Sequence, residues 1–119
     1  MPDESKTLPF EVPDLFAGFA EGKGLAKASP VELTLEFVVR DSLVNVLKSR
    51  LKEIHIPRSE IDTVRLKRGL FGAKVHIRVK SMKFLADLPG CDSGELTLHV
   101  ARRDRDQAEG FVQMLSAPG

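Results

Sequence analysis

The chain has 119 residues, of which 18 are basic and 17 are acidic, so its formal net charge is +1 at pH 7. This length predicts one small domain that buries roughly two-thirds of its unfolded surface around a single core. A balance this close to neutral excludes an overall field that would attract nucleic acid or a membrane, and any electrostatic site must be local.

Residues 1–22 are expected to form a partly disordered N-terminal tail before the domain at residues 23–116. Residues 1–8 are polar and aperiodic, which predicts disorder, and Pro13 is tolerated in a first turn, which predicts a short helix after Val12. The nearby aromatic residues are expected to pack on the outside of a barrel or to plug one end; a lid or a partner-binding peptide is the alternative. They are Phe10, Phe16 and Phe19.

The start of the chain lacks the basic and apolar regions of a signal peptide. No apolar run approaches the roughly 20 residues that a membrane span needs, and Cys91, the single cysteine, cannot form an internal disulfide. These features predict a cytoplasmic protein.

From Lys23 onward the hydrophobic period is mostly that of strands. Lys23–Ala28 is expected to pair with Val31–Val39, where apolar and polar residues alternate. Leu43–Lys48 and Leu51–Ile56 are expected to form a hairpin about Ser49-Arg50, although LVNVLKSRLKEI also has a helical period. The next two predicted strands, Ile61–Lys67 and Ala73–Lys80, flank RGLFG, whose glycines permit a tight turn.

Residues 81–93 are expected to be a connection whose apolar side chains pack inward, namely Met82, Phe84, Leu85 and Leu88. In GELTLHVARRDRDQAEGFVQML the period then changes from two residues to that of a helix. Leu96, Leu98 and Val100 share one strand face, and an apolar helix stripe follows at Ala108, Phe111, Val112 and Leu115. Asp104 is a suitable N-cap, and Gln107 occupies the position of its capping-box partner.

About seven short strands and one helix predict a mainly β fold, a curled antiparallel sheet or small barrel with the helix over its open end. The segments VELTLEFVVRD, KEIHIPRSEIDTV, AKVHIRV and LPGCDSGELTLHVARRDRDQAEGFVQML resemble the pleckstrin-homology-like superfold, in particular small bacterial stand-alone members of uncharacterised function. The resemblance covers residues 23–116 and implies a seven-stranded antiparallel barrel of two nearly orthogonal sheets, capped by one C-terminal helix. HIPRSEI resembles its strand corner. The tryptophan usual in the family's helix is absent, and Phe111 or Met114 is the nearest substitute.

Residues that could support catalysis or metal binding are few. His55, His76 and His99 are expected on the outward face of the sheet, and no cysteine or carboxylate set completes a metal site. Cys91 has no histidine with an assignable orienting role, and GLFGAK lacks the spacing of a phosphate-binding loop. The sequence therefore predicts no enzyme, no cofactor and no metal, and without tryptophan or tyrosine it does not favour nucleic-acid binding.

The best positive signal is a basic outer stripe on two neighbouring strands, with Leu70 and Phe71 at the hairpin tip between them. The candidate surface comprises Arg65, Lys67, Arg68, Leu70, Phe71, Lys74, Arg78 and Lys80. The alternative is an ordinary solvated strand face with the apolar pair folded back over the core. Acidic residues on other strands could neutralise part of the stripe; they are Glu32, Glu36, Glu53 and Asp62.

Three hypotheses for function follow, in order of preference. The first is a non-catalytic binding or scaffolding module, with a protein or peptide ligand favoured over a lipid, using a sheet edge or the groove beside the helix; a second copy of the chain is another candidate partner. The second is peripheral attachment to an anionic membrane through the basic and apolar hairpin at residues 67–74. A small-molecule enzyme is the least favoured.

Overall fold

The computed structural model describes residues 5–15, 20–41, 51–85 and 94–116. Its strands are β1 (Lys6–Leu15), β2 (Ala20–Ala28), β3 (Glu32–Asp41), β4 (Lys52–Pro57), β5 (Ile61–Arg68), β6 (Gly72–Val79) and β7 (Glu95–Ala101). Three short 3-10 turns and one helix complete the fold: η1 (Arg58–Glu60), η2 (Met82–Leu85), η3 (Arg102–Asp104) and α1 (Arg105–Ser116). The predicted strand at residues 43–48 lies outside the described residues, as do Phe16, Phe19, Leu88 and Cys91.

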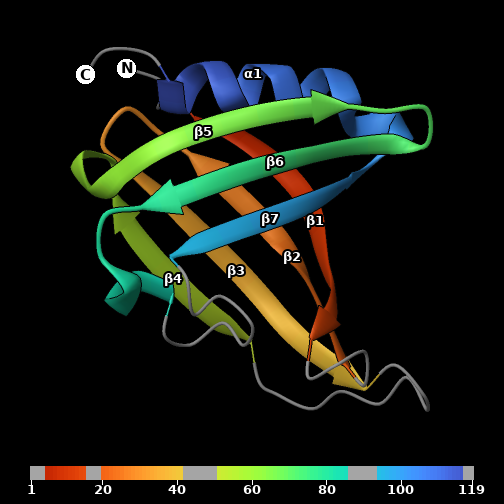
Figure 1. Cartoon of the computed structure of the whole chain (residues 1–119), viewed down its shortest axis with the longest axis horizontal. Helices are drawn as coiled ribbons and strands as arrows, with labels where there is room; N and C mark the ends of the chain where they lie inside the picture. Colours follow the sequence, from red (N-terminus) through yellow and green to blue (C-terminus); the bar gives the residue numbers. More distant parts are fainter. Residues whose placement is uncertain (1–4, 16–19, 42–50, 86–93, 117–119) are drawn as a thin grey trace.

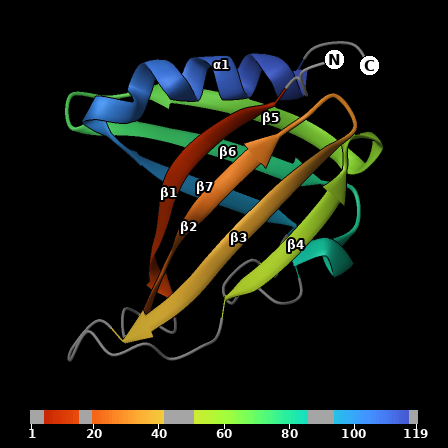
Figure 2. The same cartoon turned by 180° about the vertical axis from the view of Figure 1, so that it is seen from behind.

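The seven strands form one antiparallel sheet in the order β4-β3-β2-β1-β7-β6-β5. The sheet curls so that β1–β4 face β5–β7, and α1 lies across one end (Figures 1 and 2). Its two edges, β4 and β5, are joined in sequence by η1, but no backbone ladder connects them in the described part of the chain. The fold is therefore a loose barrel capped by a C-terminal helix, as the sequence predicted.

Alternating apolar residues build the core. The inward residues of β3, β4, β6 and β7 are buried where the sequence predicted them, including Leu35, Ile56, Ile77 and Leu98. Val31 is an exception: it precedes β3 and is exposed, because the chain there turns around Ser29, whose hydroxyl oxygen accepts the N–H groups of Val31 and Glu32.

The N-terminal segment corrects the prediction of a tail followed by a helix. Residues 6–15 form β1, between β2 and β7, so the chain is extended over residues 6–8 and again after Val12. Leu8, Phe10 and Val12 are buried at strand spacing, and this burial outweighs the two prolines that concealed the pattern. Phe10 therefore lies in the core and not on the outside of the barrel.

Helix α1 closes the barrel with one apolar stripe. Ala108, Phe111 and Leu115 are buried, while Val112 packs partly buried against the same core. At the helix C-terminus, Arg58 Nε donates to the Leu115 carbonyl oxygen at 2.8 Å, which satisfies an acceptor that a helix end leaves unpaired. The helix is thus fixed to the strand corner at η1.

Gln107 has a different role from the capping-box partner that the sequence suggested. Its Nε2 donates to the Thr7 carbonyl oxygen at 2.5 Å. Near Thr7, β1 pairs with β2, but within the described residues it pairs with β7 only at Glu11 and His99, so no strand borders β1 on its other side at Thr7. The amide therefore fixes α1 to β1 instead of closing the first turn of its own helix.

Candidate ligand-binding groove

The β5–β6 hairpin ends in a tight turn at Gly69–Gly72. The Gly69 N–H donates to the Gly72 carbonyl oxygen at 2.7 Å, which leaves Leu70 and Phe71 at the tip. A side chain at Gly72 would overlap the carbonyl oxygen of Val100 on β7, so glycine allows the hairpin to approach that strand. The two glycines that the sequence analysis noted thus define the turn.

Both tip side chains project into solvent. Leu70 is 79% exposed and Phe71 is 91% exposed. The alternative in which this apolar pair folds back over the core is therefore wrong. The adjacent leucine and phenylalanine thus form an exposed apolar patch at the tip of the hairpin.

Two arginines fix the hairpin to the start of α1. Arg105 Nη1 donates to the Gly69 carbonyl oxygen at 2.8 Å. Arg68 contacts Glu109 Oε2 at 2.6 Å and Asp106 Oδ1 at 3.2 Å, and these hydrogen bonds raise its pKa above the ordinary value for arginine. Arg68 therefore stays cationic, and its contacts with the helix support the hairpin.

The predicted outward residues of the two strands lie opposite one another in the sheet. Thr63 pairs with Arg78, Arg65 with His76, and Lys67 with Lys74, and all six are exposed. Arg78 is partnered, since its Nη2 lies 2.6 Å from Glu95 Oε1 on β7. The remaining basic residues have no ion pair within the described part of the chain; they are Arg65, Lys67, Lys74 and Lys80.

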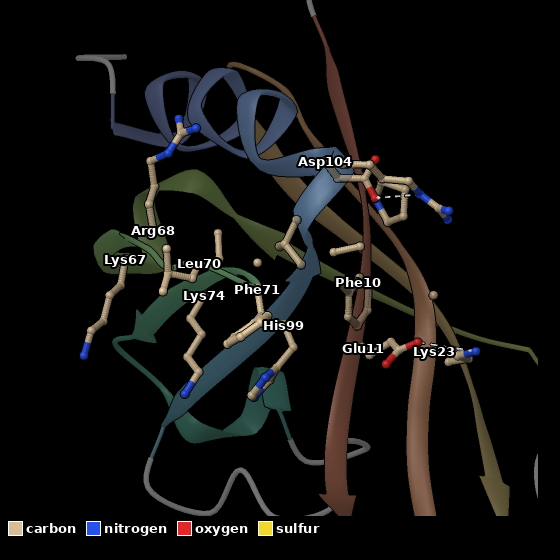
Figure 3. Close-up of a pocket in the computed structure, with 18 residues that line it drawn as sticks. Phe10, Glu11, Lys23, Lys67, Arg68, Leu70, Phe71, Lys74, His99 and Asp104 are labelled. Atoms are coloured by element: carbon tan, nitrogen blue, oxygen red, sulfur yellow. Dashed lines mark ion pairs between the residues drawn. The ribbon is translucent and has the colours of Figure 1, made fainter.

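A groove of about 730 Å³ lies beside this stripe. The hairpin forms one wall, β1 and β2 form the other with Pro9, Glu11 and Lys23, and β7 lies between them (Figure 3). Phe10, Ala73 and Val100 are also among the lining residues, although their side chains are nearly buried. We call this concavity, together with Leu70 and Phe71, the hairpin groove.

The charges in the hairpin groove are unevenly compensated. Lys23 Nζ lies 3.3 Å from Glu11 Oε1, and Arg103 Nε lies 3.8 Å from Asp104 Oδ2. These contacts use the two carboxylates that line the groove. Lys67 and Lys74 are left as a positive pair. Figure 3 shows that both side chains extend away from α1, as do those of Phe71 and His99.

The three histidines lie on the outer face, but not in one site. His55 Nε2 is 2.6 Å from Glu53 Oε1, and His76 Nδ1 is 3.0 Å from Thr97 Oγ1. His99 is half-buried and lines the groove. Over the described ranges, no group of three histidine, cysteine or carboxylate residues is placed to hold a metal ion.

The far wall of the groove was missing from the predicted site. Pro9, Glu11 and Lys23 enter it because β1 and β2 lie next to β7 in the sheet. The signal in the sequence was the alternation of Leu8, Phe10 and Val12, which places Glu11 on the outward face. Among the predicted site residues, Lys67, Arg68, Leu70, Phe71 and Lys74 line the groove, whereas Arg65, Arg78 and Lys80 do not.

Comparisons with protein-family models, curated proteins and solved structures gave no match for this chain. In the part of the chain that the structure describes, no helix is both long enough and apolar enough to traverse a lipid bilayer.

Proposed function

We propose that this protein is a non-catalytic binding module of the pleckstrin-homology-like type, and that the hairpin groove holds a segment of a partner protein in the cytoplasm. The seven-stranded antiparallel sheet and C-terminal helix are compatible with that superfold. The observation that carries the proposal is the solvent-exposed Leu70–Phe71 tip, which is held to α1 by Arg68 and Arg105 and lies beside the groove.

The contacts of Arg68 and Arg105 support a binding role because they reduce the conformational entropy that the hairpin loses on association. A hairpin already held by Arg68 and Arg105 needs little further ordering when a ligand arrives. Covering a phenylalanine side chain contributes about 1.5–3 kcal/mol, which is enough for Phe71 to act as an anchor. The groove beside it supplies room for an extended segment.

A phage-displayed library of random peptides of about twelve residues tests the proposal, with selection on the wild-type protein and on Phe71→Asp as the matched control. Peptides with an apolar residue that bind wild type and are lost on the variant are the expected result. Failure to enrich any sequence that distinguishes the two proteins would refute the groove as a peptide site.

Peripheral membrane attachment is the second candidate, because an apolar tip above Lys67 and Lys74 also fits an anionic bilayer surface. Each lysine near such a surface contributes about 1 kcal/mol. Sedimentation with phosphatidylcholine vesicles containing about one-third phosphatidylserine, at low salt, separates the two functions. Equal sedimentation of wild type and Phe71→Asp would reject the membrane function.

A further inference from the structure

Lys67 and Lys74 are directly opposite each other on β5 and β6. Like charges directly opposite each other destabilise a sheet. Carboxylates relieve other cations nearby: Glu95 contacts Arg78, and Glu109 contacts Arg68. The lysine pair is thus a local excess of positive charge in a protein whose net charge is only +1.

The neighbouring positions on the same face do not neutralise this excess. Across the sheet, Lys74 on β6 pairs with His99 on β7, and His99 pairs with Glu11 on β1. The Glu11 carboxylate already contacts Lys23 at 3.3 Å. Along the strands the next outward residues are Arg65 and His76, and His76 is hydrogen-bonded to Thr97. An anion from outside the described chain can therefore approach the pair without displacing an existing partner.

We propose that the Lys67–Lys74 pair selects a protein segment in which acidic residues stand next to an apolar anchor, the anchor packing on Leu70 and Phe71. This inference rests on the proposed function and adds the chemistry of the partner. In an extended segment, residues two apart share a face, so two carboxylates can face the lysines while a neighbouring apolar side chain packs on Leu70 and Phe71.

Carboxylates suit this site better than a phosphoryl group. The guanidinium fork of Arg68, which would match phosphate oxygens in a bidentate manner, is engaged with Glu109 and Asp106, and that of Arg103 lies 3.8 Å from Asp104. Arg65 lies one outward position further from the tip than Lys67. Two lysines on neighbouring strands are separate point charges, and separate carboxylates along a segment match them. The exposed setting also makes the attraction sensitive to salt.

The experiment continues from the peptide selection. One selected peptide with an apolar residue is synthesised in three forms: as selected, with each Asp or Glu replaced by Asn or Gln, and with a phosphoserine replacing the acidic residues. Fluorescence anisotropy measures their binding to wild type, to Lys67→Glu/Lys74→Glu, and to Lys27→Glu/Lys52→Glu. The last variant has the same net charge, but its substitutions lie outside the groove.

We expect the acidic peptide to bind wild type at least about tenfold more tightly than its amide form, and the groove variant to lose this preference while the control retains it. Raising the salt from about 50 to about 300 mM should weaken the acidic peptide more than the amide form. Equal binding of the acidic and amide forms would overturn the inference and leave the proposed function intact, provided that both still require Phe71.

Two other outcomes also count against the inference. Markedly tighter binding of the phosphoserine form than of the acidic form would replace acidic segments with phosphorylated ones as the ligand class. A selection that yields no peptide, together with vesicle binding that Phe71→Asp abolishes, would refute both the inference and the peptide-binding function in favour of the membrane.

Discussion

Phe111 and Phe71 differ in their surroundings although they are the same residue type. Phe111, on α1, has no exposed surface, and Phe71, at the tip of the β5–β6 hairpin, is 91% exposed. The N-terminal part of α1 is linked to the hairpin by Arg68 and Arg105, so the two regions are in direct contact. The same residue type thus contributes to the core at one position and is left exposed to solvent at the other.

Removing the helix should have the largest effect. A chain that ends at Arg103 loses the side chains that cover the barrel end and exposes a large apolar patch, so we expect it to unfold or aggregate. Circular dichroism and size-exclusion chromatography check this expectation. A soluble, monomeric and cooperatively unfolding fragment would refute the role of α1 as the cap.

Phe111→Ala should reduce the free energy of unfolding by about 3–5 kcal/mol, because it removes buried apolar area and leaves a cavity. That is a large share of the roughly 5–15 kcal/mol available to a domain. Urea denaturation measures the change. A loss below about 1 kcal/mol would mean that the barrel end does not depend on this side chain.

Gly110→Ala should act in the opposite direction. Gly110 lies inside α1, and an added Cβ would meet only the Lys6 side chain, at 3.9 Å, which is ordinary contact. Alanine is favoured over glycine in a helix by about 1 kcal/mol, so the free energy of unfolding should rise by up to that amount. Thermal denaturation measures it, and a lowered melting temperature would contradict this account of the helix.

Phe71→Ala should have the smallest effect on folding, within about 0.5 kcal/mol, because the side chain has little contact to lose. The same urea denaturation used for Phe111→Ala is the measurement, which makes the two variants a matched pair. A destabilisation comparable to that of Phe111→Ala would show that the tip is a folding element, and would remove the main argument for a ligand there.

The strands after Lys23 were predictable because burial on one face imposes a two-residue period, as in Leu33, Leu35 and Phe37. The same period gave the outward register of Lys67 and Lys74. β1 was missed because prolines are uncommon within strands, so Pro9 and Pro13 suggested a break. The low strand propensity of proline is a local effect, and here the burial of Leu8, Phe10 and Val12 in the core determines that the segment is a strand.

The opposite wall of the groove could not be predicted even with every strand assigned. It forms because β1 lies beside β7, a pairing between segments nearly a whole chain apart. No local pattern records which strands become neighbours across such a distance. Likewise, the engagement of Arg68 with Glu109 depends on where α1 crosses the barrel, so the sequence could identify a basic hairpin but not its two free lysines.

The position of β1 also has a consequence for the route by which the chain folds. Strands β1–β4 pair with their neighbours in sequence, and so do β5–β7, whereas β1 meets β7 only after nearly the whole chain has been made. Local contacts form faster than distant ones, so the two halves should acquire structure early and dock late. During synthesis the apolar face of β1–β4 would stay exposed until the rest of the chain is made. Docking of this half onto β7 and α1 would then be the slow, aggregation-sensitive step.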